Sequence, residues 1–257
     1  MNNMHRREWI RLAACGSMGL LLPPASMATP DAKIPLNSPA PLISEEELLG
    51  LKTPPLMGKG YRLRRLASEA FAKMRDAARQ DGICLYSVSS YRSFESQKRI
   101  WNRKYRQYKK KGMNHQAIVE TIIQYSSIPG ASRHHWGTDL DIIDESFKRP
   151  SDPLLSKHFQ KNGIYHPLYV WLEEHAADYD FYEVYTNDAN RTGYAYEPWH
   201  WSYAPLSIPF LRQYQQIDLY SHWRQSDMEG HTNFTREFVE RFQRKWVGGV
   251  NPRLKPK

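Results

Sequence analysis

Two short segments of this 257-residue chain hold side chains of the types that bind a metal ion and activate water. In the segment SRHHWGTDLDI, His134 and Asp141 stand on either side of a glycine with six residues between them. In the segment EPWHWSY, Glu197 precedes His200 by three positions. Two neutral imidazoles and one carboxylate make an open, three-ligand zinc site, and a further carboxylate beside it can act as the general base for a metal-activated water. The sequence therefore predicts metal-assisted hydrolysis.

The elements that position these side chains follow from the hydrophobic periodicity. Helices are predicted at 44–51, 63–80, 93–110, 114–125, 167–177, 208–214 and 235–246, and strands at 83–88, 138–143, 181–185 and 199–203. The second strand would carry Asp139 and Asp141 on one face because side chains alternate along a strand. This order of elements predicts an α+β fold, with a small, mainly antiparallel sheet flanked by helices and the zinc site in a cleft on the sheet.

The first 28 residues have the order of an export signal. A basic opening precedes an apolar run at 12–22, and the residues Ser-Met-Ala end directly before Thr29. The paired Arg6 and Arg7 resemble a twin-arginine signal. An uncleaved membrane anchor and lipidation at Cys15 are the alternatives, but the apolar run is short for a span and most of it follows Cys15. We therefore expect cleavage, a periplasmic location and no membrane span in the mature protein.

Three blocks of the sequence, in this order and spacing, are SSYRSFESQ at 89–97, SRHHWGTDLD at 132–141 and EPWH at 197–200. Together they resemble the zinc D-alanyl-D-alanine carboxypeptidases of bacterial cell walls, a family that includes the VanY-like and LD-carboxypeptidase groups. The resemblance covers roughly residues 63–205. It implies one Zn²⁺ ion held by three protein ligands, which are His134, Asp141 and His200, and it implies that Glu197 is the catalytic base.

The resemblance also assigns the substrate side of the site. It implies that Arg92, Gln97 and Ser132 face the substrate and that they grip its terminal carboxylate or polarise the scissile carbonyl, with Arg92 counted among the catalytic groups. The planar guanidinium of arginine suits a carboxylate or a developing oxyanion. Glu197 would take a proton from the attacking water and return it to the leaving amine.

Two residues in the second block stand beside the implied ligands. The family has a small apolar residue where this chain has Asp139, which either orients a ligand or competes with Asp141 for the metal. The spacing found in the family, counted from His134, favours Asp141 as the metal ligand. The neighbouring His135 raises the same question for the imidazole, and the spacing to the glycine favours His134, with His135 as a cleft or packing residue.

The implied activity is hydrolysis of the last peptide bond of a peptidoglycan stem peptide, with release of D-alanine. An LD-carboxypeptidase and an endopeptidase that cuts cross-links would use the same site. A catalytically silent, zinc-dependent module that binds the cell wall is the alternative outside enzymes. The presence of Glu197 and of all three implied ligands argues against that module.

The predicted organisation is a signal peptide at 1–28, a linker and N-terminal arm at 29–62, a zinc peptidase domain at 63–205 and a helical C-terminal extension at 206–257. The net charge of +9 would suit nucleic acid, but an exported protein meets acidic cell-envelope polymers instead. We therefore expect a peptidoglycan stem peptide as partner and no nucleic acid. The sequence makes no prediction of the oligomeric state.

Mass spectrometry of the exported protein tests the signal peptide. Because a signal peptidase reads the small residues before Thr29, the mature chain should begin at Thr29. An intact Met1 would show that the segment is retained, and a lipidated Cys15 would show a lipoprotein.

Overall fold

The computed structural model describes residues 42–257. The predicted signal peptide at 1–28 and the first part of the predicted linker lie outside the described residues. Among the helices that are described, none combines the length and the apolar character needed to cross a membrane.

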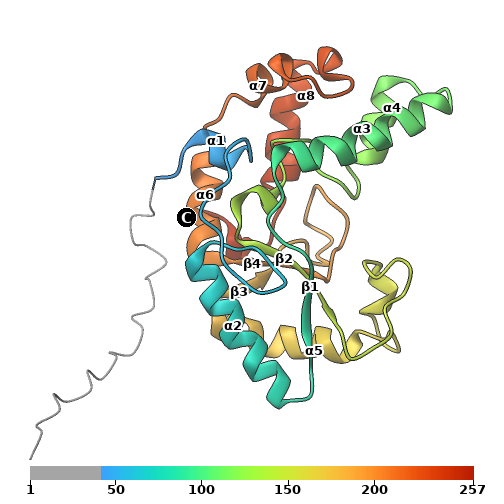
Figure 1. The fold of residues 1–257 in the computed structure, drawn as a ribbon. Coiled ribbons are helices and arrows are strands. Elements are labelled where there is room, and N and C mark those ends of the chain that lie inside the picture. The colour runs from blue at the N-terminus through green and yellow to red at the C-terminus, as the bar shows by residue number, and fades with distance from the viewer. Residues whose placement is uncertain (1–41) are drawn as a thin grey trace, which may run out of the picture. The chain divides into compact units, whose positions relative to one another are not determined.

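A four-stranded antiparallel sheet with strand order β1-β2-β4-β3 lies at the centre of the described residues (Figure 1). The strands are β1 (Leu85–Ser89), β2 (Asp139–Asp144), β3 (Phe181–Glu183) and β4 (His200–Tyr203). The α-helices of this part are α1 (Glu45–Leu48), α2 (Arg65–Gln80), α3 (Phe94–Lys110), α4 (His115–Ile122), α5 (His166–His175), α6 (Ala204–Tyr214), α7 (Leu219–Gln225) and α8 (Arg236–Phe242). The predicted α+β class with a small antiparallel sheet is confirmed.

The two faces of the sheet have different chemistry. One face is apolar and packs against α2 and α5, which lie below the strands in Figure 1, and the ring of Phe71 on α2 meets the ring of Phe181 on β3. The other face carries Asp139 and Asp141, whose neighbours across the β2–β4 pair are Ser202 and His200. Because directly paired residues share a face, four polar side chains gather on one small area of the sheet.

An irregularity in β1 aligns this strand with the polar face. Ser87 pairs with Ile142, but Ser89 pairs with Asp141, so one extra residue is accommodated between them. Such a bulge changes which side chains point to a given face. It places Ser89 next to Asp141, on the face that carries the polar residues.

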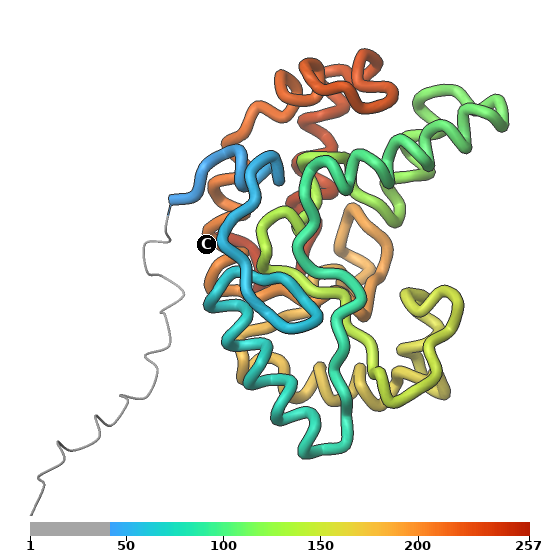
Figure 2. The backbone as a smooth tube through the Cα atoms, viewed as in Figure 1, coloured from blue at the N-terminus to red at the C-terminus, as the bar shows by residue number. Residues whose placement is uncertain are grey.

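The chain segments before and after the sheet region hold the loop that leads into β2. From the N-terminal side, the carbonyl of Leu48 accepts a hydrogen bond from the indole of Trp136 at 3.2 Å. From the C-terminal side, the hydroxyl of Tyr214 donates to the carbonyl of Gly130 at 2.6 Å, and the indole of Trp223 donates to that of Pro129 at 2.8 Å. Residues after 206 therefore share the hydrophobic core with the sheet and help to fix the segment that precedes the metal motif. Figure 2 shows the path of these segments.

The C-terminal part differs most from the sequence-based expectation. Helix α6 begins at Ala204 and not at 208, because Pro205 lies in its first turn, where a missing N–H group costs no hydrogen bond. Helix α7, which the periodicity did not predict, begins at Leu219 and is capped by Asp218, whose side chain accepts a hydrogen bond from the backbone of Ser221. Helix α8 ends at Phe242 and continues as a short π-helix, Gln243–Val247.

Glu183 on β3 lies on the apolar face and has an unusual environment. It is 5 % exposed, its Oε1 atom has no hydrogen-bond partner among the described residues, and the hydroxyl of Tyr169 lies 3.5 Å from Oε2. Burial raises the pKa of Glu183 from 4.5 to about 8, and the charge of Glu173 adds to this effect. Between pH 4.5 and about 8, Glu183 keeps its proton in the folded chain and loses it in the unfolded chain. The unfolding free energy therefore falls as the pH rises through this range.

Glu183→Gln should therefore flatten the dependence of the unfolding free energy on pH between about 5 and 8, and should stabilise the protein at pH 8 by on the order of a few kcal/mol. Chemical denaturation at several pH values, with the metal content held constant, measures this. The exposed Glu174 on α5 provides the control, since Glu174→Gln should leave the dependence unchanged. Equal pH dependence in wild type and Glu183→Gln would contradict the assignment.

Candidate metal centre

His134 reaches the polar face of the sheet from a short 3-10 helix, Arg133–Trp136, which ends at Gly137. Gly137 has a φ of 66°, a conformation that favours glycine and lets the chain turn directly into β2. The imidazole Nδ1 of His134 donates to the carbonyl of Ser90 at 2.8 Å, because a carbonyl can only accept. In the neutral ring, the Nε2 atom then keeps its lone pair for a metal, and it faces Oδ2 of Asp141 at 3.4 Å.

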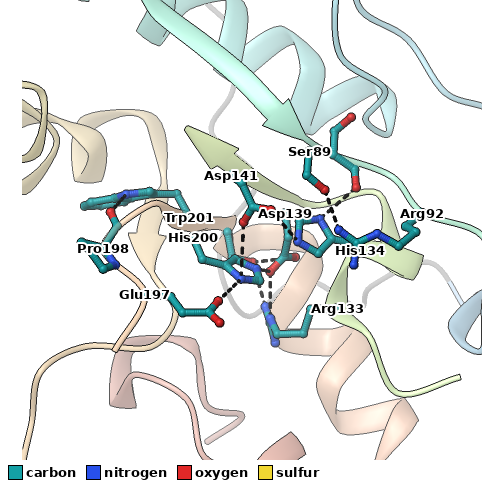
Figure 3. Close-up of polar contacts among 12 residues, drawn as sticks. Ser89, Arg92, Arg133, His134, Asp139, Asp141, Glu197, Pro198, His200 and Trp201 are labelled. Carbon is teal, nitrogen blue, oxygen red and sulfur yellow. Dashed lines mark hydrogen bonds and ion pairs between the residues drawn. The ribbon is translucent and has the colours of Figure 1, made fainter. Parts of the chain in front are cut away.

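Asp141 and His200 come together because they are paired across β2 and β4. The Nε2 atom of His200 lies 3.1 Å from Oδ1 of Asp139, which can only accept, so Nε2 carries the hydrogen. The other ring nitrogen, Nδ1, faces Oδ1 of Asp141 at 3.8 Å. In Figure 3, dashed lines join the Asp141 carboxylate to both imidazoles.

The three side chains His134, Asp141 and His200 fit a zinc ion. Their donor atoms all lie within 4.8 Å of one another, and all three residues are buried. Zinc–ligand bonds of about 2.0–2.2 Å in a tetrahedron separate neighbouring donors by about 3.4 Å. Here His134 lies 3.4 Å from one oxygen of Asp141 and His200 lies 3.8 Å from the other. In addition, Oδ1 of Asp141 is buried and has no hydrogen-bond partner among the described residues. A buried, unsatisfied carboxylate oxygen is costly, and a cation bound there would remove the cost.

Asp139 lies behind His200 and has no oxygen to spare. Its Oδ1 atom accepts from His200 and, at 2.8 Å, from Nε of Arg133 (Figure 3). Its Oδ2 atom accepts from the hydroxyls of Ser202 and Thr138. The ion pair with Arg133 is almost completely buried. Burial alone would raise the pKa of Asp139, but the charge of Arg133 and the hydrogen bond from His200 lower it below its ordinary value. Of the two roles considered for Asp139, this geometry favours orienting a ligand over binding the metal.

Burial would lower the pKa of His200, but contacts with carboxylates reverse this. Hydrogen bonds to Asp139 and Glu197 and the charge of Asp141 raise it to about 9. A metal ion that binds Nδ1 must therefore displace a proton, as is general for histidine ligands.

Glu197 stands beside His200 at the mouth of the site. The turn that carries it is closed by hydrogen bonds from the backbone of His200 to the carbonyl of Glu197 and from the indole of Trp201 to the carbonyl of Pro198, both at 3.0 Å. Its Oε2 atom lies 3.2 Å from Nδ1 of His200, the same nitrogen that is offered to a metal. Because one nitrogen cannot serve both partners, the Glu197 carboxylate is free to accept a proton from water once Nδ1 is a ligand.

The residues expected on the substrate side occupy different positions. Arg92 and Ser132 line the cleft, whereas Gln97 does not. Gln97 is fully buried, and it accepts from Nη1 of Arg92 at 2.8 Å and donates to the carbonyl of Ser127 at 2.6 Å. Nη2 of Arg92 donates to the hydroxyl of Ser89 at 2.8 Å. Gln97 is thus placed to hold Arg92, and Arg92 is placed to meet a substrate.

His135 points away from the cleft into the core. Its Nδ1 contacts the carbonyl of Arg92, and its Nε2 accepts from the backbone of Gly130 at 3.1 Å. Burial lowers the pKa of His135 to about 3, so the ring is neutral. Of the two roles expected for this residue, the structure supports packing.

The cleft over these residues has a volume of about 470 Å³. The three candidate ligands, Glu197 and Arg92 line it together with other polar side chains, and so do aromatic and apolar side chains, namely Tyr125, Leu154, Leu155, Tyr185, Tyr194 and Trp199. A concave site of this size, which combines aromatic side chains with a set of convergent polar and charged groups, suits a small polar molecule or a short peptide.

The sheet and its buried donor set define a candidate metallohydrolase. Residues 60–206 match the family model "VanY: D-alanyl-D-alanine carboxypeptidase", which is more than half of the chain. The protein belongs to the VanY D-alanyl-D-alanine carboxypeptidase family.

Individual relatives share less than a third of the aligned residues with this chain. A D-alanyl-D-alanine carboxypeptidase of Enterococcus faecalis is 29% identical over 151 residues, or 58% of this chain and 51% of the relative. The bifunctional D-Ala-D-Ala dipeptidase and carboxypeptidase VanXYC of Enterococcus gallinarum is 28% identical over 120 residues, or 46% of this chain and 55% of the relative. The chain thus spans about half the length of these two relatives. The solved structure of VanYB in complex with D-alanine-D-alanine is 26% identical, with 67% of this chain and 88% of that chain covered and a TM-score of 0.47.

Arg133 was not predicted from the sequence to be part of the site, although this residue lies between Ser132 and His134. The sequence did contain one signal for it, since Arg133 and Asp139 carry opposite charges within one short motif. Lys104, which also lines the cleft, gave no signal because basic residues recur along the whole of its helix.

Substitution of Asp139 separates its two roles. If it orients His200, Asp139→Asn should weaken zinc binding by about 10–100-fold, whereas Asp141→Asn should abolish it. Because Arg133 would lose its buried partner, Asp139→Asn should also lower the unfolding free energy by about 3–5 kcal/mol. Competition titrations with a zinc chelator, together with thermal unfolding, measure both effects. Loss of zinc in Asp139→Asn with retention in Asp141→Asn would make Asp139 the ligand.

Proposed function

We propose that this protein is a zinc-dependent D-alanyl-D-alanine carboxypeptidase that removes the terminal D-alanine from peptidoglycan stem peptides. The single observation that carries the proposal is the convergence of His134, Asp141 and His200 with Glu197 in one cleft. Membership in the VanY family supports the reaction type and the substrate class.

The zinc ligands of this proposal are His134, Asp141 and His200, each held by a neighbour. The N–H groups that face away from the metal donate to Ser90 and Asp139, which fixes the orientation of both rings. When bound, zinc supplies a Lewis acid that polarises the scissile carbonyl and lowers the pKa of a water molecule to about 7.

Glu197 acts as the general base and then as the general acid. Its carboxylate takes a proton from the attacking water and returns it to the amine of the departing D-alanine. Arg92 supplies a fixed positive charge for the terminal carboxylate of the substrate or for the negative charge that develops on the carbonyl oxygen. Gln97 and Ser89 hold the guanidinium in place, and Ser132 offers a hydroxyl at the wall of the cleft.

We also propose that the reaction takes place outside the cytoplasm, in the periplasm, after export through the twin-arginine-like signal at 1–28. Residues 63–205 would form the peptidase domain, and residues 206–257 would support it through contacts such as that of Trp223 with Pro129. A stem peptide in the cell wall is the expected partner, and nucleic acid is not.

Glu197→Ala should retain zinc and lose turnover by about 10²–10⁴-fold, because the base is removed and the ligands are not. The assay is mass spectrometry of a muropeptide pentapeptide after incubation with the zinc-loaded protein, which should show loss of one alanine that a chelator abolishes. Asp152→Asn is the matched control, since this exposed carboxylate lines the same cleft without contacting a candidate ligand.

Near wild-type turnover in Glu197→Ala would overturn the assigned base. Cleavage of a tetrapeptide or a cross-linked dimer in place of the pentapeptide would move the activity to an LD-carboxypeptidase or an endopeptidase. Binding to murein sacculi without any product would indicate a silent binding module.

A further inference from the structure

A lysine in the cleft has no part in the mechanism proposed above. Lys104 lies near the middle of α3 and lines the same cavity as Arg92, Glu197 and His200. Its amine forms no hydrogen bond and no ion pair with any residue of the described part of the chain.

Several other basic side chains near the cleft or on the same helix have partners. On α3, Lys98 pairs with Asp227 at 2.7 Å and Arg106 pairs with Glu229 at 2.8 Å. In the cleft, Arg133 pairs with Asp139.

The surroundings of Lys104 disfavour its positive charge. Burial lowers the pKa of Lys104, the positive charges of Arg103 and Arg92 lower it further, and the charge of Glu197 opposes them only in part. A half-buried cation next to other cations is unfavourable, and an anion bound in the cleft would offset this cost.

The position of Lys104 on α3 sets its distance from the reaction centre. Gln97, which holds the guanidinium of Arg92, is seven residues earlier on the helix and therefore on the same face. Seven residues of α-helix span about 10 Å along the axis. One residue of an extended peptide spans about 3.3–3.6 Å. The amine of Lys104 can therefore bind a group of the substrate that lies within roughly three residues of the scissile bond along the cleft.

We propose that Lys104 binds a carboxylate that the substrate carries on the N-terminal side of the scissile bond, in addition to its terminal carboxylate. The inference rests on the proposed function, because it takes a stem peptide as the ligand of this cleft. Arg92 binds the reacting end of the peptide, and Lys104 favours substrates that carry a second negative charge farther from the scissile bond. Lys104 is then a residue that determines specificity and takes no part in the bond-breaking step.

Stem peptides can carry this second carboxylate at two places, and synthetic peptides separate them. Diaminopimelate at the third position has a side-chain carboxylate that lysine at the same position lacks. A γ-linked glutamate at the second position has a free α-carboxylate that isoglutamine lacks. Four pentapeptides that combine these alternatives differ in charge while keeping nearly the same shape.

The experiment measures the dissociation constants of the four pentapeptides by calorimetry with zinc-loaded Glu197→Ala protein. This background prevents cleavage, and it removes the effect of Lys104 on the charge of Glu197. One carboxylate-bearing peptide should bind about tenfold more tightly than its counterpart that lacks this carboxylate, as expected for a charge-assisted hydrogen bond. Lys104→Gln should reduce this preference to about one, and Lys104→Arg should retain it. Arg103→Gln, which removes an exposed neighbouring charge from the same helix, should leave the preference unchanged.

Equal binding of all four peptides, absence of binding, or a preference that survives in Lys104→Gln would overturn the proposal. The peptide pair that shows the preference identifies the carboxylate. Turnover by the wild-type protein is measured on the same peptides and reports separately on the proposed function. A preference that depends on Lys104 in a protein without turnover would refute the carboxypeptidase and keep the anion site. Turnover without the preference would refute the anion site alone.

Discussion

The register of β2 against β4 is the constraint on which the candidate metal centre depends. It pairs Asp141 with His200 and Asp139 with Ser202, so a ligand and its support lie side by side on both strands. A shift of one residue would turn one set of side chains to the opposite face and replace a carboxylate with Leu140. The apolar residues of the same strands, packed on α2 and α5, oppose such a shift because it would expose them to the cleft. The hydrophobic core therefore fixes the geometry of the polar face.

The imidazoles are oriented by groups that do not bind the metal. Ser90 and Asp139 each accept the N–H on the far side of a ring, so His134 offers Nε2 and His200 offers Nδ1. Asp139 is held ionised by Arg133, and this buried pair is costly to form unless all its hydrogen bonds are made. The arrangement gives two imidazoles and one carboxylate with an open side, where Glu197 and Arg92 face the cleft. The geometry of the site thus depends on residues that lie behind the candidate ligands.

Much of the fold could be predicted from the sequence, because its strands and most of its helices follow local patterns of residues. Four strands and most helices follow from hydrophobic periodicity and caps such as Ser93, which accepts a hydrogen bond from the backbone of Ser96. The proximity of His134, Asp141 and His200 was also expected, from spacing and from the family resemblance, and the separations of their donor atoms, all within 4.8 Å, agree with it.

The remaining features depend on contacts between distant segments. Trp223 reaches Pro129 across 94 positions, which no local pattern records. The side of α3 that meets the cleft, with Lys104, is decided by packing and not by the basic pattern of the helix. Anomalous diffraction at the zinc edge, from crystals of the zinc-loaded protein, would locate the metal and its ligands. We expect one peak in the cleft, bonded to Nε2 of His134, to an oxygen of Asp141 and to Nδ1 of His200, with Asp139 still hydrogen-bonded to Nε2 of His200. A peak bonded to Asp139 or to Nε2 of His200, or no peak in the cleft, would contradict this expectation.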